Sequence, residues 1–360
     1  MKGKWFYSVF AVILLIYFVY LNFFLPVQGQ NTVIVRKGEL ARDVAVKLKE
    51  KGIIERPDLF VSLAKLLALG DDLKSGLYSL KKNLPELRLL LYLALQSKGG
   101  RLIRVRILEG WELKKIASEL SYRLGVDSLR FLRLASDTLF IRELRAQYPE
   151  IDSPPSLEGY ILPDTYKLPW GVSEERLLRY FVGHTVSVWR REFRRDADSL
   201  GMSMKEVLTL ASIIEKEAQV EREKPLISAV FHNRLRRGRP LQSCATIEYV
   251  LPRRKKVLSF RELKLDSPYN TYLIKGLPPG PIASPSTSSI KAALHPADVD
   301  YLYFVSKGDG THFFSRTLAE HLHYKRIARQ LWRRKEEEAQ KAAVDSTKNG
   351  EFIRDNPLTD

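Results

Sequence analysis

Cysteine is almost absent from this sequence of 360 residues, because Cys244 is the only one. A single cysteine cannot form an intramolecular disulfide, and it cannot supply a cysteine-rich zinc or iron–sulfur site. The sequence also lacks G-x-S-x-G, H-E-x-x-H, Walker A and G-x-G-x-x-G motifs. Their absence argues against a serine hydrolase, a metalloprotease, a P-loop NTPase or a dinucleotide-binding enzyme of the usual kind. The six histidines show no metal-ligand spacing. We expect neither a metal nor an organic cofactor.

Acidic residues are fewer than basic residues in this sequence. The chain has 59 Lys and Arg against 42 Asp and Glu, which gives a formal net charge of +17 and a pI of about 9.7. An excess of positive charge is typical of proteins that bind an anionic partner such as nucleic acid, a lipid surface or an acidic polymer. The alternative is that the charged side chains only keep the surface solvated. The 45% hydrophobic content is high enough to bury real cores, and the length exceeds one typical domain.

The N-terminus has one long run without charge. Residues 5–25 could span about 30 Å as a helix, which is the thickness of a bilayer core. Lys2 and Lys4 precede the run, so the pattern predicts a cytoplasmic segment 1–4, a transmembrane helix 5–25 and an extracytoplasmic remainder. This placement argues against nucleic acid as the partner and favours lipid headgroups or cell-wall material.

The remainder of the chain indicates an α+β fold with two further parts. Gly38 and Gly110, 72 residues apart, each separate a strand-like segment from an amphipathic helix, which predicts small α+β modules within residues 31–150. Three prolines between residues 149 and 156 mark a boundary before a catalytic domain at 156–335. Residues 336–360 form a polar tail that we expect to be disordered.

Two carboxylates stand out on the helix predicted at residues 204–223. Glu215 and Glu217 each lie about 80° from the apolar stripe of that helix, so periodicity does not choose between them. Most helix glutamates are exposed and inert. A boundary position also suits an acid that lines a cleft, where partial burial raises its pKa and lets it donate a proton near neutral pH.

Several motifs occur in an order that resembles the endolytic murein transglycosylase, or YceG-like, family. The resemblance is close over residues 156–325. The motifs are LEGYILPDTY (157–166), ASIIEKE (211–217), VFHNRL (230–235), LQ (241–242), SPYNTY (267–272), GLPPGPI (276–282), AALHP (292–296) and YLYFV (301–305).

The resemblance implies a single-pass enzyme of the inner membrane that cuts glycan strands of peptidoglycan and carries a LysM-like module before its catalytic domain. It assigns Glu215 as the catalytic acid and base, which acts without a metal or cofactor and leaves 1,6-anhydro ends. Penicillin-binding proteins or other cell-wall synthases are the implied partners, and nucleic acid is not. The alternative is a non-catalytic scaffold, anchored in the membrane, that binds peptidoglycan.

Further residues are candidates for binding the glycan, although some of them could instead fix turns. Amide, hydroxyl and aromatic groups suit hydrogen bonding to sugars and stacking on them. The candidates are Glu158, Gln242, Thr246, Tyr269, Asn270 and Tyr272.

The sequence departs from the family pattern at two places. Cys244-Ala245 replaces the usual Asp-Pro, and we expect a buried structural thiol there. The segment Ser284-Pro-Ser286 replaces the usual Asn-Pro-Gly. The first departure puts local substrate contacts in doubt, while Glu215 itself is retained.

Overall fold

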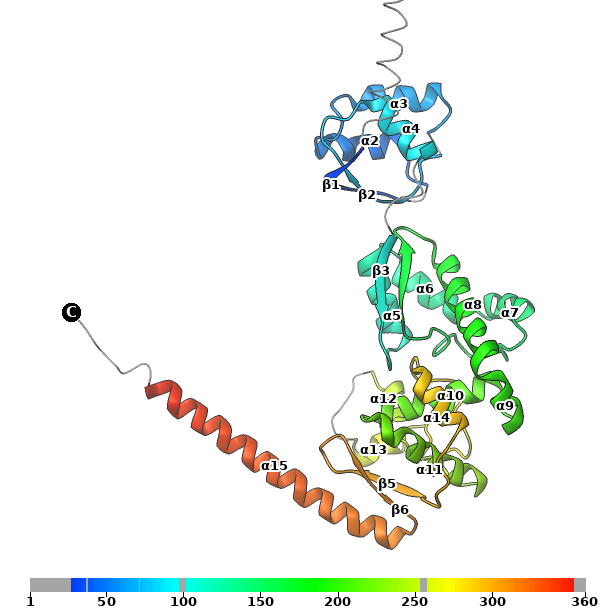
Figure 1. Ribbon diagram of the computed structural model, residues 1–360, viewed down its shortest axis with the longest axis vertical. Coiled ribbons are helices and arrows are strands. Elements are labelled where there is room, and N and C mark those ends of the chain that lie inside the picture. Colours follow the sequence, from blue (N-terminus) through cyan, green and yellow to red (C-terminus); the bar gives the residue numbers. More distant parts are fainter. Residues whose placement is uncertain (1–26, 37, 71, 97–101, 253–257, 353–360) are drawn as a thin grey trace, which may run out of the picture. The chain divides into compact units, whose positions relative to one another are not determined.

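The computed structural model describes residues 27–36, 38–70, 72–96, 102–252 and 258–352 (Figure 1). The chain divides into two compact units. Unit 1 is the chain up to Ile107 together with Lys114–Leu134 and Asp164–Leu178. Unit 2 is Leu108–Leu113, Ala135–Pro163 and the chain from Arg179 onward. Small sheets and many helices confirm the α+β class, but the division does not follow the single boundary expected at 149–156.

Unit 1 begins with a two-stranded antiparallel sheet covered by helices. Strand β1 (Gln28–Val35) pairs with β2 (Gly76–Leu80), and α2 (Ala41–Glu50) and α3 (Pro57–Leu66) lie between them in the chain. Helix α4 (Glu86–Leu91) follows and continues as a π-helical turn, η1 (Tyr92–Gln96). The apolar residues of α2 recur three and four positions apart and pack into one core with the alternate residues of both strands.

The second sheet of unit 1 joins segments from both sides of the expected domain boundary. Strand β3 (Leu102–Ile107) pairs antiparallel with β4 (Asp164–Pro169). Helices α5 (Leu113–Leu124) and α6 (Ser128–Ala135) follow β3 in the chain. A strand, a glycine turn with positive φ and a helix therefore recur, as the repeat around Gly38 and Gly110 predicts. The prolines at 149–156 do not end the module, because β4 lies beyond them.

Unit 2 is mainly helical. Its central helix, α10 (Met204–Glu217), starts at a capping box in which Ser203 and Glu206 satisfy each other's backbone N–H groups. Helix α14 packs against α10 and α11. The helices are α7 (Thr138–Gln147), the later part of α8 (Glu174–Glu192), α9 (Arg194–Leu200), α10, the 3₁₀ turn η2 (Glu221–Glu223), α11 (Lys224–Arg236), α12 (Cys244–Val250), α13 (Phe260–Leu263) and α14 (Thr287–Leu294).

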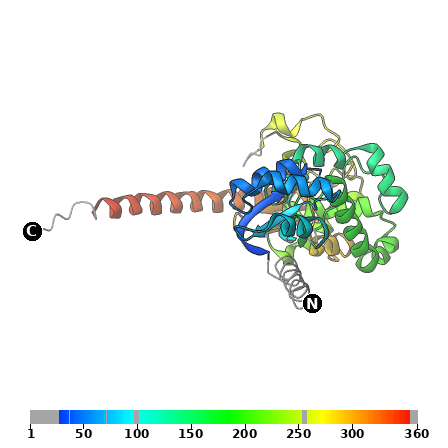
Figure 2. The ribbon, with the colours of Figure 1, turned by 90° about the horizontal axis from the view of Figure 1, so that it is seen from above.

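A hairpin and a long helix complete unit 2. Strands β5 (Tyr303–Ser306) and β6 (His312–Ser315) pair antiparallel. Helix α15 (Leu318–Phe352) begins against this hairpin, and Figure 2 shows its later turns extending away from it. The helix thus occupies most of the stretch expected to be a disordered tail. The reason is local, because Lys, Glu, Ala and Gln, which dominate residues 335–343, are strong helix formers.

The predicted location at a membrane is contradicted. Among the residues that the structure describes, no helix is long and apolar enough to cross a bilayer. The longest described helices, α8 and α15, carry many Arg, Lys and Glu side chains. Residues 5–25, on which the prediction of a single-pass inner-membrane protein depended, lie outside the described residues. The prediction is therefore corrected.

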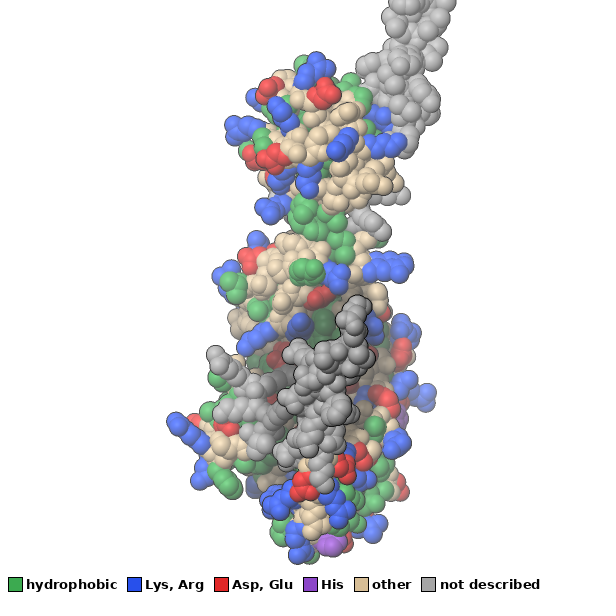
Figure 3. Space-filling view, turned by 90° about the vertical axis from the view of Figure 1, so that its left-hand side faces the viewer, with side chains coloured by type: hydrophobic (Ala, Val, Ile, Leu, Met, Phe, Trp, Pro, Cys, Tyr) green, Lys and Arg blue, Asp and Glu red, His purple; other side chains and the backbone are tan. Residues whose placement is uncertain are grey.

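On the face in Figure 3, Lys and Arg side chains lie among acidic and apolar ones and do not form one continuous patch. On this face the distribution favours the solvated-surface interpretation of the charge.

Candidate active site

Glu215 lies in the last turn of α10, immediately after the buried part of that helix. The residues from Val207 to Ile214 are all buried, whereas the side chain of Glu215 keeps 10% of its surface exposed. The core therefore fixes the backbone of Glu215 and leaves its carboxyl group at the edge, as the periodicity predicts.

The carboxyl group of Glu215 is held through one of its two oxygens. Oε2 accepts hydrogen bonds from the backbone N–H of Ser286 at 2.9 Å, from the Ser289 hydroxyl at 2.7 Å and from the Ser286 hydroxyl. These donors stand at the N-terminus of α14, where Ser286 is also the N-cap. Oε1 has no partner among the described residues, so it is the oxygen that can meet a substrate or exchange a proton.

A buried ammonium group stands behind the same oxygen. Lys224 is only 3% exposed, and its Nζ lies 3.5 Å from Oε2 of Glu215. The Nζ also donates to Oε1 of Glu221 at 2.6 Å and to the Ser288 hydroxyl at 2.8 Å. A buried charge needs such partners, so the network keeps Lys224 in place beside the carboxylate.

The second glycine of the repeat lies beside Glu215. Gly110 has φ +69°, and a Cβ there would lie 3.9 Å from the Glu215 Cγ. Its backbone N–H donates to Ser284 O at 2.8 Å, and the Ser284 N–H donates to Trp111 O at 2.8 Å. At Gly38, the matching glycine, a Cβ would have no described atom within 4 Å beyond its chain neighbours. The turn at Gly110 therefore forms one wall next to the carboxyl group.

Glu217 points to different partners from those of Glu215. It accepts a hydrogen bond from the Ser243 hydroxyl, and it lines a cavity of about 390 Å³. Burial raises the pKa of Glu217, while the Ser243 bond and His312 act in the opposite direction. The two carboxyl groups therefore lie in different surroundings, as expected from their separation of about 200° around the helix.

Two of the predicted glycan-binding residues line this same cavity. Gln242 and Tyr272 lie there with Glu217. Gln242 has φ +54°, a left-handed conformation that costs energy for a residue other than glycine. Its N–H donates to Thr271 O at 2.8 Å, and its Oε1 accepts from Arg234 Nη1 at 2.9 Å. These two hydrogen bonds hold the strained backbone in place.

The other predicted binding residues have mainly structural contacts. Both carboxylate oxygens of Glu158 accept from the backbone N–H of Leu113, at 3.0 and 3.1 Å. Thr246 donates to Ser243 O, and Asn270 donates to two backbone carbonyls. All three are at least 96% buried, whereas Tyr269 is half-buried.

The cysteine differs from the expectation. The Cys244 thiol is exposed, and its Sγ lies 3.0 Å from the Tyr272 hydroxyl at the same cavity. A polar neighbour replaces the apolar surroundings expected of a structural thiol. The protein atoms around Sγ nevertheless displace water from it, and this desolvation raises the pKa of Cys244, so the thiol is a poor nucleophile.

The residues that hold Glu215 are not among those predicted from the sequence. Ser286, Ser289 and Lys224 come from segments up to 74 positions away in the chain, and no local pattern links them to the helix. One signal was available, because Ser286 replaces the usual glycine of the family pattern.

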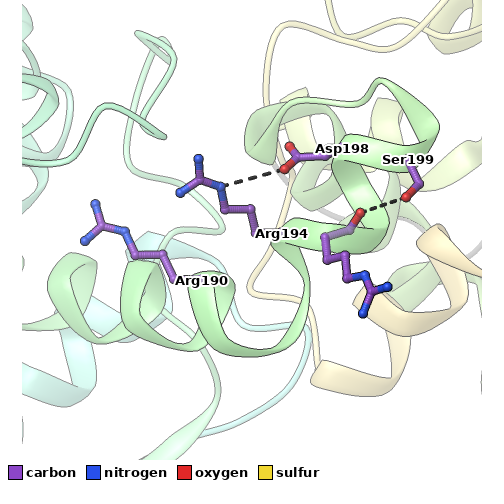
Figure 4. A pocket seen from close by; sticks show the side chains of 5 residues that line it. Arg190, Arg194, Asp198 and Ser199 are labelled. Atoms are coloured by element: carbon purple, nitrogen blue, oxygen red, sulfur yellow. Dashed lines mark hydrogen bonds and ion pairs between the residues drawn. The ribbon is translucent and has the colours of Figure 1, made fainter.

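The arginine-rich turn between α8 and α9 forms a shallow surface pocket of about 520 Å³ (Figure 4). Arg190 binds both carboxylate oxygens of Glu150, at 2.6 and 2.8 Å, and Arg194 lies 3.8 Å from Asp198. These exposed ion pairs neutralise much of the local charge, so this cluster belongs to the solvated surface.

The comparisons with known proteins agree with one another. The sequence model of the YceG-like family matches residues 33–327. The endolytic murein transglycosylase of Bacillus subtilis (strain 168) is 31% identical over 303 residues, which cover 80% of this chain and 81% of the relative. The endolytic murein transglycosylase of Streptococcus pneumoniae (strain D39) is 30% identical over 343 residues, which cover 85% of this chain and 61% of the relative. The crystal structure of a yceG-like protein from Listeria monocytogenes has a TM-score of 0.57 and 32% identity, and the match covers 82% of this chain and all of that one.

Proposed function

This chain belongs to the YceG-like family, and on that premise we propose that it is an endolytic murein transglycosylase in which Glu215 is the catalytic acid and base. The assignment rests on a difference in hydrogen bonding between the two carboxyl oxygens of Glu215. Oε2 is fixed by three hydrogen bonds and faces a buried ammonium group, and Oε1 has no partner among the described residues. A carboxyl group held in this way can give and take a proton at Oε1 without changing its position.

The first step breaks the glycosidic bond. Protonated Glu215 donates its proton to the oxygen between N-acetylmuramic acid and N-acetylglucosamine, and the bond from that oxygen to the muramyl C1 breaks. The N-acetyl group of the muramyl residue stabilises the oxocarbenium-like centre, so a second carboxylate is not needed as a nucleophile. The Glu215 carboxylate that remains is stabilised at Oε2 by the two serines and by Lys224.

The second step closes the ring. The muramyl C6 hydroxyl attacks C1, and Oε1 of Glu215 accepts the hydroxyl proton, which restores the protonated acid. The products are a 1,6-anhydromuramyl end and a free N-acetylglucosamine hydroxyl. No water is consumed, so the cleavage is a lyase reaction and requires no cofactor.

The proposal also covers the rest of the chain. The module of β1, α2, α3 and β2 has the size and composition of the LysM-like module that the family resemblance implies, and we assign it to glycan binding. The family resemblance alone supports a penicillin-binding protein or another cell-wall synthase as a partner.

The test is product analysis with the full chain and purified peptidoglycan. Mass analysis of the released fragments distinguishes three outcomes. Anhydromuramyl ends would support the proposal. Reducing ends would mean hydrolysis by a muramidase, and uncut strands that co-sediment with the protein would favour the non-catalytic scaffold. Either of the last two results would overturn the proposed function.

A further inference from the structure

Glu223 and His312 form a buried ion pair that the proposed reaction does not use. Their side chains are 8% and 6% exposed, and both residues belong to unit 2. Oε2 of Glu223 lies 2.7 Å from His312 Nδ1, and Oε1 accepts the His312 backbone N–H at 3.1 Å. An ionised carboxylate only accepts hydrogen bonds, so we assign the imidazole proton of this contact to Nδ1. We call these two residues the buried pair.

Glu223 stands at the N-cap of α11, yet its side chain makes no capping hydrogen bond to that helix. An N-cap side chain usually accepts from the backbone N–H groups of the first helical turn, and glutamate is not among the residue types favoured there. Both oxygens of Glu223 are instead bound to His312, the first residue of β6. The buried pair therefore ties the start of α11 to the hairpin and does not serve the helix end itself.

Lys224 follows Glu223 directly in the chain. Its Nζ lies 3.5 Å from Oε2 of Glu215. Lysine carries its ammonium group on a flexible stem, so the place of that group depends on the backbone that bears it. This backbone is held on one side by the buried pair and on the other by Pro225, whose carbonyl accepts the Ala297 N–H at 3.0 Å. The buried pair thus acts one residue away from the cation that faces the catalytic carboxyl group.

His312 has a second neighbour on α10, which gives it another route to the reaction. Burial raises the pKa of Glu217, and His312 is among the groups that lower it. In the part of the chain that the structure describes, no hydrogen bond joins His312 to Glu217. The route to Glu215 consists of direct contacts, because two hydrogen bonds lead to Glu223 and the adjacent residue is Lys224. The contacts therefore favour the route through Lys224.

We propose that His312 is a positioning residue for the reaction. Through Glu223 it fixes the start of α11, and so it keeps the ammonium group of Lys224 beside the catalytic carboxyl group. The inference rests on the proposed function, because it takes Glu215 as the acid and base. In that reaction a carboxylate forms at Glu215 when the glycosidic bond breaks, and a cation already in place stabilises this charge without rearrangement.

Two substitutions in the full chain separate the Nδ1 hydrogen bond from the rest of the imidazole. The amide nitrogen of His312→Asn can take the place of Nδ1, whereas the amide of His312→Gln lies one bond further out. Both variants lose the ring and its edge-on contact with Phe304. Since a misplacement of about 1 Å can cost about a hundredfold in rate, His312→Gln should lower kcat roughly 10- to 100-fold with KM unchanged.

His312→Asn should retain most of the kcat of the parent, because it restores the donor to Glu223. His323→Gln makes the same chemical change at an exposed position of α15 and should match the parent. Release of anhydromuropeptides gives kcat and KM, and thermal melts show that each protein is folded. Equal kcat values for His312→Asn and His312→Gln would overturn the inference.

The same two substitutions in a chain that carries Lys224→Met identify the route. If His312 acts through Lys224, the two substitutions should have equal kcat values in this background, because the group that they position is gone. A difference that persists there would mean that His312 acts by another route, such as Glu217, and would overturn the inference.

Crystal structures of the His312→Asn and His312→Gln proteins decide the inference without turnover. The separation of 3.5 Å between Lys224 Nζ and Glu215 Oε2 should be kept in the first variant and lost in the second. An unchanged separation in both would overturn the inference. This measurement is independent of the proposed function, since a parent protein that released no anhydromuropeptides would refute the function while the separation still tested the positioning.

Discussion

At the scale of single residues, the site depends on how Oε2 of Glu215 is held. Ser289 contributes one hydroxyl donor to this oxygen, at 2.7 Å, from inside α14. Ser289→Ala removes that donor, and Ser286 and Lys224 remain in place. Hydrogen bonds to charged groups contribute about 1.5–3 kcal/mol, so kcat should fall roughly 10- to 150-fold with KM little changed.

Thr287→Ala is the matched control for that measurement. Thr287 lies on the same helix, is exposed, and its side chain makes no hydrogen bond to any described residue. Steady-state release of anhydromuropeptides by both variants gives the comparison. If Ser289→Ala and Thr287→Ala had the same kcat, the hydrogen bond to Oε2 would have no part in catalysis.

Glu217 gives a prediction about pH and stability. Burial raises the pKa of Glu217 in the folded protein above the unfolded value of about 4.3. The folded state therefore binds this proton more tightly than the unfolded state does, and stability falls as the pH rises through the window between the two pKa values. Glu217→Gln cannot ionise, and its amide oxygen can still accept from Ser243.

The Glu217→Gln variant should therefore have a higher Tm than the parent protein at about pH 7, and the difference should shrink as the pH approaches about 4. Calorimetry over this range measures both proteins under the same conditions. A difference that grows on acidification would mean that the folded protein stabilises the ionised form.

At the scale of elements, the N-terminus of α14 has two roles that can be separated. The Ser286 hydroxyl accepts from the Ser289 N–H as an N-cap, and it also donates to Glu215. Ser286→Ala and Ser286→Gly both remove the donor, so both should lower kcat to a similar extent. Alanine is a poor N-cap, whereas glycine costs only a few tenths of a kcal/mol.

Chemical denaturation should therefore find Ser286→Ala about 1 kcal/mol less stable than the parent, and Ser286→Gly nearly unchanged. If the activities of the two variants followed their stabilities, the hydroxyl would act only as a helix cap, and its bond to Glu215 would be incidental.

Elements with a strong local pattern could be predicted from the sequence. The stripe of α10 placed Glu215 and Glu217 on its two sides, and the repeat around Gly38 and Gly110 predicted a strand, a glycine turn and a helix in each copy. What holds Glu215 could not be predicted in this way. Ser286, Ser289 and Lys224 meet it only because α11 and α14 pack on α10, and such packing leaves no local periodicity.

Residue type alone leaves the predicted glycan contacts open for a similar reason. Polar residues suited to sugar contacts are also the residues that satisfy buried backbone groups, and residue type alone does not separate these uses. In the structure Glu158 accepts from a backbone N–H group and Asn270 donates to backbone carbonyls, and a glycan contact of either residue stays a prediction. The division into units was also missed, because the pairing of β3 with β4 spans about sixty residues.

At the scale of the whole molecule, the net charge of +17 predicts a salt effect on binding. Glycan strands with free carboxylates are polyanions, and the Debye length falls from about 30 Å at 0.01 M salt to about 10 Å at 0.1 M. We expect KM to rise several-fold over this range. The value of kcat should change little, because the ion pair of Lys224 with Glu215 is buried and screened much less.

Strands with amidated carboxyl groups are the control for the salt effect, since their KM should be nearly independent of salt. Initial rates at several salt concentrations give both parameters. A fall in kcat at constant KM would show that salt acts on the site itself and not on the encounter with the strand.

The central claim is that one carboxyl group, that of Glu215, performs both proton transfers. The most direct test is the release of anhydromuropeptides by Glu215→Gln and Glu217→Gln, with matched thermal melts of both variants. The amide of Glu215→Gln can neither donate nor accept the proton, so release should fall by at least about 10²–10⁴-fold while the fold is kept. Glu217→Gln should lose far less. Near-normal release by a folded Glu215→Gln protein, together with an inactive Glu217→Gln protein, would contradict the account and transfer the catalytic role to Glu217.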